Sequence, residues 1–217
     1  MVNINNKDEC GEEEKHLGEE EAVNFLRCLR EAVQGDAEAQ CELGEMYEFG
    51  PAPYQDIEYA MKWYRKSAEQ GNAVAQFRLG WCLKMNDWDS EEAVDWIRKA
   101  ADQGFAEAQC ELGEMYDMDD PVEAAKWYRK AAEQGDHSAQ TNLGELLYSG
   151  EGVIQDLVEA YKWFNLAATQ DRPQGDPLAP TGRKRRDAIA KEMTKEQITE
   201  AQKLSREWMV KHSEKNK

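Results

Sequence analysis

Apolar residues recur every three or four positions through most of this chain. In residues 37–47, one stripe of a helix would hold Ala39, Leu43 and Tyr47. In residues 59–71, a second stripe would hold Ala60, Trp63, Tyr64 and Ala68. Neither segment shows the strict alternation of apolar and polar residues that marks a half-buried strand. The pattern therefore predicts pairs of amphipathic helices and an all-α fold.

The helix pairs repeat in register. The string AEAQCELGEMY runs from Ala37 to Tyr47 and again from Ala106 to Tyr116, and looser copies begin at Ala73 and His137. The Leu-Gly pairs in the four copies are 36, 33 and 31 residues apart. A second motif runs in phase and carries one tryptophan per copy, at Trp63, Trp96, Trp127 and Trp163. Self-similarity at this period is typical of one supersecondary unit stacked several times, which predicts an α-solenoid.

Two sets of glycines follow the repeat. Gly35, Gly71, Gly104 and Gly135 come just after the second helix, where a left-handed residue commonly ends a helix. Gly44, Gly80, Gly113 and Gly144 fall inside the first helix, where glycine costs about 1 kcal/mol relative to alanine. A costly glycine in every copy indicates that the partner helix comes too close for a side chain, and we expect this contact beneath the tryptophan.

The repeated residues resemble the Sel-one-like repeat family, which is related to the tetratricopeptide repeats. The fourth copy matches the family pattern best, from Ala139 through Leu143-Gly144, Gly150, Gly152 and Asp156 to Trp163. The resemblance covers residues 36 to 170, and the short loops of the two middle copies depart from it. It implies a right-handed solenoid of antiparallel helix pairs with a concave binding face, and it does not imply one activity.

The segments outside the repeats have different compositions. Residues 1–18 are predicted to be a mobile acidic tail, and residues 19–34 a capping helix with Phe25, Leu26, Leu29 and Val33 on its apolar side. The repeats follow in residues 35–170. Residues 171–217 are predicted to form a loop and C-terminal capping helices. Thr194 and Gln197 form the capping box of the last helix, near 195–212, whose apolar side would hold Ile198, Ala201, Leu204, Trp208 and Met209.

The charge of the chain argues against one class of partner. The net charge is −17, and residues 1–170 hold 36 acidic but only 15 basic residues. Such a body repels phosphates, so we expect no nucleic-acid partner and favour a basic protein or peptide. Solubility alone explains the acidity equally well. The basic run Arg183-Lys184-Arg185-Arg186 is expected to be solvated or neutralised within the molecule.

Signals of catalysis and of metal binding are weak. The chain contains no GxxxxGK[ST], GxGxxG, HExxH or GxSxG motif, and its three histidines are scattered. The acidic stretch 117–120 is a poor cation site, and Asp119 or Asp120 is better suited to cap a helix that begins at Pro121. The five cysteines form no CxxC pair and are expected to be free thiols, with a redox switch as the alternative. We therefore predict no catalytic residues, no cofactor and no metal.

The resemblance to tetratricopeptide-like arrays implies that the first helix of each pair lines the concave face. The positions turned toward it, and so the predicted partner-binding residues, are Glu38, Cys41, Glu45, Glu48, Phe77, Trp81, Glu107, Cys110, Glu114, Asp117, Glu145 and Tyr148. Val74, Lys84, Ser138 and Thr141 share the same register. Phe77 and Trp81 replace Cys and Glu of the neighbouring copies, and they act either as apolar anchors for a partner or as packing against a neighbouring helix.

The leading interpretation is a non-catalytic scaffold or adaptor that binds a basic or amphipathic peptide or protein, and an inhibitor or immunity-type role against a basic toxin falls within it. A β-lactam-type hydrolase, an activity claimed for some relatives, is one alternative. A structural oligomer built by end-to-end stacking is another. No signal peptide or membrane span is recognised, so we expect a cytoplasmic protein that is a monomer or weak oligomer.

Overall fold

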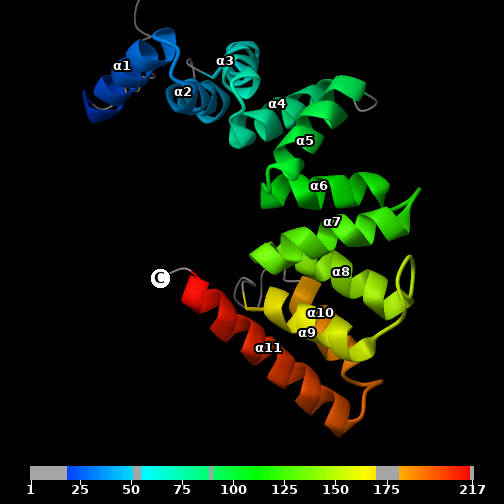
Figure 1. The fold of residues 1–217 in the computed structure, drawn as a ribbon. Coiled ribbons are helices and arrows are strands. Elements are labelled where there is room, and N and C mark those ends of the chain that lie inside the picture. Colours follow the sequence, from blue (N-terminus) through cyan, green and yellow to red (C-terminus); the bar gives the residue numbers. More distant parts are fainter. Residues whose placement is uncertain (1–18, 51–54, 88–89, 170–180, 216–217) are drawn as a thin grey trace, which may run out of the picture. The chain divides into compact units, whose positions relative to one another are not determined.

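The computed structural model describes residues 19–50, 55–87, 90–169 and 181–215. These residues form only helices and their connections (Figure 1). The helices are α1 (Glu19–Val33), α2 (Ala37–Phe49), α3 (Ile57–Glu69), α4 (Ala73–Asn86), α5 (Glu91–Asp102), α6 (Ala106–Tyr116), α7 (Pro121–Gln134), α8 (His137–Ser149), α9 (Leu157–Ala167), α10 (Thr181–Ile189) and α11 (Lys195–Lys215). The predicted all-α solenoid is confirmed. The chain divides into two compact units, Met1–Asn72 and Ala73–Lys217. The proposed acidic tail, residues 1–18, lies outside the described residues.

Helix ends form where the sequence supplies capping groups. The side chains of Asp36, Asp56, Asp136 and Asp156 accept hydrogen bonds from backbone N–H groups in the first turns of α2, α3, α8 and α9. Asp120 caps α7 in the same way, and Pro121 takes the first helical position, as predicted. The glycines after the second helices have φ between 94° and 101°, the left-handed region that was predicted for them.

The glycines inside the first helices allow each helix pair to pack closely. A Cβ on Gly44 would lie 2.5 Å from the Tyr64 ring, and one on Gly144 would lie 2.6 Å from the Phe164 ring. Gly80 and Gly113 meet Ile97 and Tyr128 in the same manner. The predicted close approach is confirmed, but its position is corrected, because the side chain above each glycine is the residue that follows the tryptophan.

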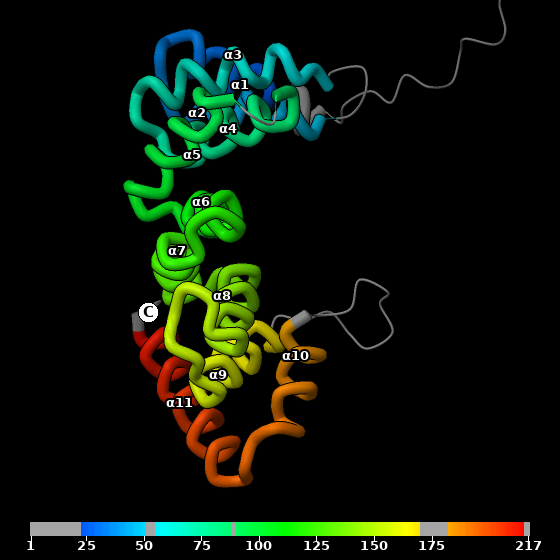
Figure 2. Tube along the Cα trace, turned by 90° about the vertical axis from the view of Figure 1, so that its right-hand side faces the viewer, coloured from blue at the N-terminus to red at the C-terminus, as the bar shows by residue number. Residues whose placement is uncertain are grey.

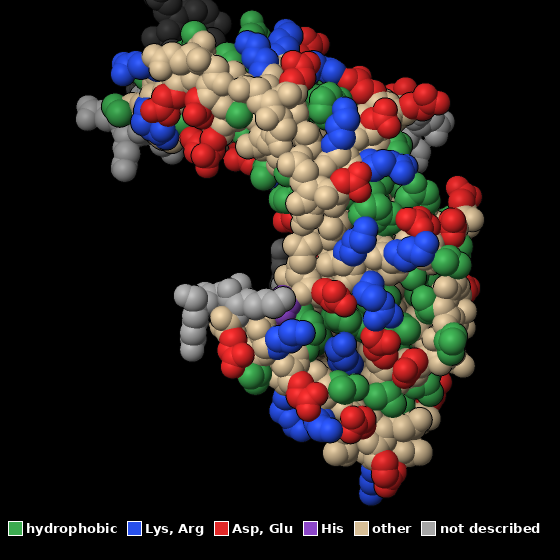
Figure 3. All heavy atoms as spheres, in the orientation of Figure 1, with side chains coloured by type: hydrophobic (Ala, Val, Ile, Leu, Met, Phe, Trp, Pro, Cys, Tyr) green, Lys and Arg blue, Asp and Glu red, His purple; other side chains and the backbone are tan. Residues whose placement is uncertain are grey.

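The tryptophans instead lie beside basic side chains. Lys66, Lys99 and Lys130 place their Nζ atoms 3.9, 3.8 and 3.6 Å from the ring centroids of Trp63, Trp96 and Trp127. Each lysine lies three residues after its tryptophan, so the two side chains share one helix face. On the face of the second unit drawn in Figure 3, acidic and basic side chains are interleaved.

Glutamine side chains connect the two helices of a pair at one end. Gln70 donates to Gln40 at 2.8 Å, Gln103 to Gln76 at 2.7 Å, and Gln134 to Gln109 at 2.8 Å. Gln40 and Gln109 also donate to the carbonyl oxygens of Ala32 and Ala101, at the end of the preceding helix. The glutamine pairs therefore fix the register within these helix pairs, and those of Gln40 and Gln109 also fix the position of the preceding helix.

In the first unit, α1 packs on α2 through part of the predicted face. Cys28 and Ala32 are buried, and Phe25 and Leu29 are partly buried against Leu43. Leu26 and Val33 were predicted on the same face, but they are 59% and 69% exposed. Their position, offset by one residue from Phe25 and Ala32, turns them away from α2.

In the second unit, α10 and α11 lie on opposite sides of α9 (Figure 2). The predicted capping box is confirmed, with the Thr194 N–H donating to Gln197 at 2.8 Å. Ala201 is buried, and Trp208 packs edge-on against Trp163 with ring centroids 6.3 Å apart. Met209 was expected to cover the end of the repeats but is 38% exposed, because it lies one residue beyond the side that meets α9.

Candidate partner-binding site

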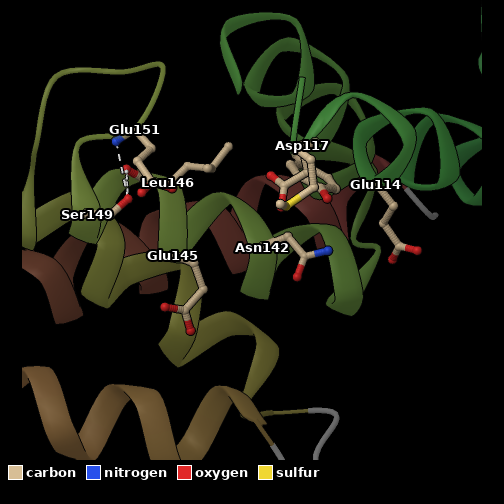
Figure 4. Close-up of a pocket in the computed structure, with 9 residues that line it drawn as sticks. Glu114, Asp117, Asn142, Glu145, Leu146, Ser149 and Glu151 are labelled. Atoms are coloured by element: carbon tan, nitrogen blue, oxygen red, sulfur yellow. Dashed lines mark hydrogen bonds between the residues drawn. The ribbon is translucent and has the colours of Figure 1, made fainter. Parts of the chain in front are cut away.

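The second unit contains an open hollow between α6 and α8. Its cavity volume is about 480 Å³. We call it the acidic pocket and define it by the four carboxylates Glu114, Asp117, Glu145 and Glu151, with Tyr128, Asn142 and Leu146 also lining it. Figure 4 shows Glu114 and Asp117 at the α6 side and Asn142 and Glu145 on α8. Three of the predicted partner-binding residues, Glu114, Asp117 and Glu145, thus line one pocket.

The local fold brings these side chains together. Glu114 lies on the last turn of α6 and Asp117 directly follows that helix, while Asn142 and Glu145 lie three residues apart on α8. Tyr128 of α7 packs against Gly113, so its ring forms the wall between the two helices. Glu151 lies in the turn after α8, where its N–H donates to the Ser149 hydroxyl at 3.2 Å.

Burial and crowding of like charges make the pocket costly to ionise. Burial raises the pKa of Glu114, and the neighbouring Glu111 raises it further, while Lys84 opposes the shift. Burial and then Glu151 raise the pKa of Asp117. Burial also raises the pKa of Glu145, although the Arg185 guanidinium opposes it. An added cation would relieve each of these effects, because an opposite charge stabilises the ionised carboxylate.

Some predicted site residues of the second unit form polar contacts with other residues of the chain. Tyr148 donates its hydroxyl to Glu192 at 3.0 Å, and Glu145 forms an ion pair with Arg185 of α10. The expected neutralisation of the basic run is therefore present at Arg185. Glu107 is exposed, and no described contact joins it to the acidic pocket.

The prediction that Cys110, Lys84 and Thr141 face a groove is wrong. Cys110 is 5% exposed and belongs to the core formed with α7 and α8, so the following helix pair covers it. Lys84 is buried in an ion pair with the buried Glu111 of α6. Thr141 is 8% exposed and donates to the carbonyl of His137 in its own helix.

The sequence left two roles open for Phe77 and Trp81, packing against a neighbouring helix and contact with a partner. The structure places the two residues in different environments. The Phe77 ring lies 5.3 Å from that of Phe105 and packs against the core around Ile97 and Leu112. Trp81 lies 6.3 Å from Phe77 and remains 37% exposed. Phe77 is thus a packing residue, and Trp81 is the large aromatic that α4 leaves partly open to solvent.

In the first unit, the predicted partner-binding residues also differ in their surroundings. Glu38 is exposed and Glu45 is half-buried in a second hollow, with Glu42, Met46 and Phe49 along α2. Glu48 accepts a 2.6 Å hydrogen bond from the Tyr64 hydroxyl. Cys41 is 6% exposed, which corrects its assignment to a groove.

Sequence reasoning missed six residues that line the acidic pocket: Met118, Tyr128, Asn142, Leu146, Ser149 and Glu151. Asn142 and Leu146 flank Glu145 at helical spacing, so they were within reach of the same periodicity. Tyr128 could be identified only once the residue after the tryptophan was known to cover the helix glycine. Glu151 carried no signal, because it lies in a turn whose path the pattern does not define.

No titratable cluster in the described segments has the composition of a metal site. Within the described residues, Cys28, Cys41, Cys82 and Cys110 are buried and form no disulfide bond. Within the described part of the chain, no helix is long and apolar enough to cross a membrane.

Comparison with known proteins identifies the repeats. The model of the Sel1 repeat matches residues 37–72, 73–105, 106–136 and 137–171. The chain belongs to the Sel1 repeat family. Proteins of this family are generally interaction scaffolds rather than catalysts.

Solved Sel1 repeat structures have the same fold. The chain is 36% identical to c5321, a protective antigen present in uropathogenic Escherichia coli strains, with a TM-score of 0.76 over 88% of this chain and 41% of that one. It is 26% identical to a Sel1 repeat protein from Oxalobacter formigenes, with a TM-score of 0.64 over 78% of each chain. The chain thus spans less than half of the E. coli antigen.

A curated plant protein shares a shorter segment. The F-box protein At1g70590 of Arabidopsis thaliana is 42% identical over 76 residues, which is 35% of this chain and 18% of that protein. The similarity therefore covers a repeat segment within a much longer protein.

Proposed function

We propose that this Sel1 repeat protein is a non-catalytic scaffold that binds a basic segment of a partner protein in the acidic pocket. One observation carries the proposal: Glu114, Asp117, Glu145 and Glu151 line one open hollow of about 480 Å³. The partly desolvated carboxylates of Glu114, Asp117 and Glu145, whose pKa values are raised, gain more from a cation than fully solvated carboxylates do, since the cation offsets both desolvation and mutual repulsion. Lysine or arginine side chains of a partner supply that charge.

The partner also needs an apolar contact if it is to be distinguished from any other cation. Leu146 and Tyr128 provide apolar surface inside the pocket, and Trp81 offers a separate exposed aromatic on α4. An amphipathic basic segment fits this combination better than a highly charged one. Inhibition of a basic toxin is a narrower form of the same proposal, supported by the net charge of −17. We also propose a cytoplasmic location, which is supported by four described cysteines that form no disulfide bond.

A direct binding experiment tests the pocket. Fluorescence anisotropy would measure the affinity of a labelled oligoarginine peptide for the wild type and for the double variant Glu114→Gln, Asp117→Asn. The matched control is Glu38→Gln, Glu107→Gln, which removes the same two charges from exposed positions. We expect the pocket variant to bind at least about tenfold more weakly than the control variant, since hydrogen bonds to charged groups contribute about 1.5–3 kcal/mol. Equal affinities for the two variants would show that only net charge matters and would refute the proposal.

Self-association is a second candidate function, because one surface favours it. Leu26 and Val33 of α1 are mostly exposed, whereas the equivalent residues of α3, Lys62 and Glu69, are charged. An apolar stripe at a position that is charged elsewhere in the array indicates a covered surface. Light scattering coupled to gel filtration would compare the wild type with Leu26→Glu at concentrations up to about 100 μM, a range in which weak interfaces associate. A wild-type mass equal to that of one chain throughout would eliminate this function.

A further inference from the structure

The short helix α10 brings a basic side chain to the acidic pocket from within the chain. Arg185 of α10 forms an ion pair with Glu145, one of the four carboxylates that define the pocket. The neighbouring Arg186 faces elsewhere and pairs with Asp187. Arg185 is therefore placed on the carboxylate that a basic partner would use.

The contacts that hold α10 against α9 do not depend on Arg185. Gly182 and Ile189 are buried, Ile189 belongs to the core of the second unit, and Arg186 donates to Asn165 of α9 at 3.4 Å. Gly182 lies so close to α9 that an added Cβ would be 2.8 Å from the Ala167 side chain. Beyond α10, Glu192 accepts the Tyr148 hydrogen bond. These contacts position the helix, while the Arg185 side chain lies on its exposed surface.

The ion pair itself is weak enough to be exchanged. The side chains of Arg185 and Glu145 are 54% and 31% exposed. Ion pairs with this exposure contribute little to stability, because water and salt screen them. In Figure 4 the Glu145 carboxylate points away from Glu114 and Asp117, so a partner segment with several basic side chains can place one on Glu145 and others on Glu114 and Asp117, whereas Arg185 supplies a single charge to one carboxylate. Exchange of Arg185 for a partner side chain is therefore favourable once a partner is present.

We propose that α10 is an internal competitor for the acidic pocket, with Arg185 occupying Glu145 until a basic segment of the partner displaces it. This inference rests on the proposed function of the pocket. It adds a specific role for one residue of the basic run, and it makes the C-terminal part of the chain a regulator of partner affinity.

Two variants with the same charge change separate this role from a general effect of charge. Arg185→Gln removes the side chain that contacts Glu145, and Lys184→Gln removes its exposed neighbour. With the oligoarginine peptide as probe, we expect Arg185→Gln to bind about threefold more tightly than Lys184→Gln, since an exposed ion pair accounts for at most about fivefold. Equal affinities of the two variants would overturn the proposal.

A double-mutant comparison gives an independent readout. In a Glu145→Gln background, the advantage of Arg185→Gln over Lys184→Gln should disappear, because the carboxylate for which Arg185 competes is gone. An advantage that persists in this background would assign the effect to some other site and would refute the competitor role.

Failure of this inference can be distinguished from failure of the proposed function. If Glu114→Gln, Asp117→Asn binds as its matched control does, the pocket is not the binding site and both proposals fall. If the pocket variant loses affinity while Arg185→Gln and Lys184→Gln stay equal, only the competitor role is wrong. Circular dichroism on each variant confirms that the helices are retained.

Discussion

Gly144 provides the sharpest test of how the helix pairs pack. Replacing it by alanine would place a Cβ 2.6 Å from Cε1 and 2.8 Å from Cδ1 of Phe164. Carbon atoms in contact are normally separated by about 3.5–4.0 Å, so either the ring or the helix must move. Phe164 is 1% exposed and packs within the core of the second unit, so a shift of its ring disturbs several buried contacts, although a hollow of about 80 Å³ adjoins it on the side of α10.

The magnitude follows from two opposing effects. Overpacking of a core typically costs about 1–3 kcal/mol. Alanine is favoured over glycine within a helix by about 1 kcal/mol. Because the ring above Gly144 is buried and the added Cβ would come closer than van der Waals contact, we take the upper end of the packing cost and expect Gly144→Ala to lower the free energy of unfolding by about 2 kcal/mol. For a chain of this size the midpoint of thermal unfolding should fall by about 4–8 °C.

Thermal unfolding followed by circular dichroism measures this change, and a second background isolates its cause. In a Phe164→Ala variant the space above residue 144 is empty, so Gly144→Ala should become neutral or stabilise the helix by about 1 kcal/mol. Stabilisation by Gly144→Ala in the wild-type background would show that helix propensity outweighs packing. An equal loss of stability in both backgrounds would show that Phe164 is not the obstacle.

Three further predictions follow from individual contacts. Lys84→Ala leaves the buried Glu111 without its ion pair and should lower the free energy of unfolding in urea by about 3–5 kcal/mol. The double variant Lys84→Met, Glu111→Leu should be close to the wild type in stability. Equal losses in the two variants would show that the cost does not come from leaving Glu111 unpaired. The raised pKa values of Glu114 and Asp117 mean that the folded state holds these protons more tightly than the unfolded state, so their ionisation destabilises the fold as pH rises. Glu114→Gln, Asp117→Asn should therefore raise the melting temperature at pH 7, and this gain should vanish below the ordinary carboxyl range; a gain independent of pH would refute the assignment. Asp136→Ala removes the hydrogen bond to the Ala139 N–H and should cost about 1 kcal/mol of unfolding free energy, whereas Asp119→Ala, which removes an exposed carboxylate, should change it little.

The helix pairs could be predicted from the sequence because the local signals for helices and the internal repeat indicate the same boundaries. The same spacing of apolar residues, the same glycine after each second helix and similar capping residues recur in each copy, so errors in one copy are corrected by the others. The caps were also within reach of the sequence, because a cap depends only on residues within one turn: Thr194 was assigned correctly, and the structure selects Asp120 from the two predicted candidates, Asp119 and Asp120.

Assignments that depend on neighbouring helices were less successful. Cys110 lies on the same face of α6 as Glu114, but the following helix pair buries it. Lys84 lies on the same face of α4 as Trp81, but it is buried in an ion pair with Glu111 of α6. Helical periodicity specifies the direction of a side chain and not what lies opposite it. The contact between Arg185 and Glu145 joins residues forty positions apart through a helix outside the repeats, so no local pattern contained it.

The glutamine pairs have a consequence for where this chain tolerates change. Gln109 and Gln134 bind each other at the end of the helix pair opposite the connection between α6 and α7. Because this hydrogen bond aligns the two helices at that end, their alignment does not depend on the connection at the other end. This independence accounts for the different lengths of these connections among the copies. Foreign sequence inserted between Met118 and Asp119 should therefore leave the stacked helices intact, and it would display the inserted segment beside the acidic pocket, where a graft can be used to change the choice of ligand.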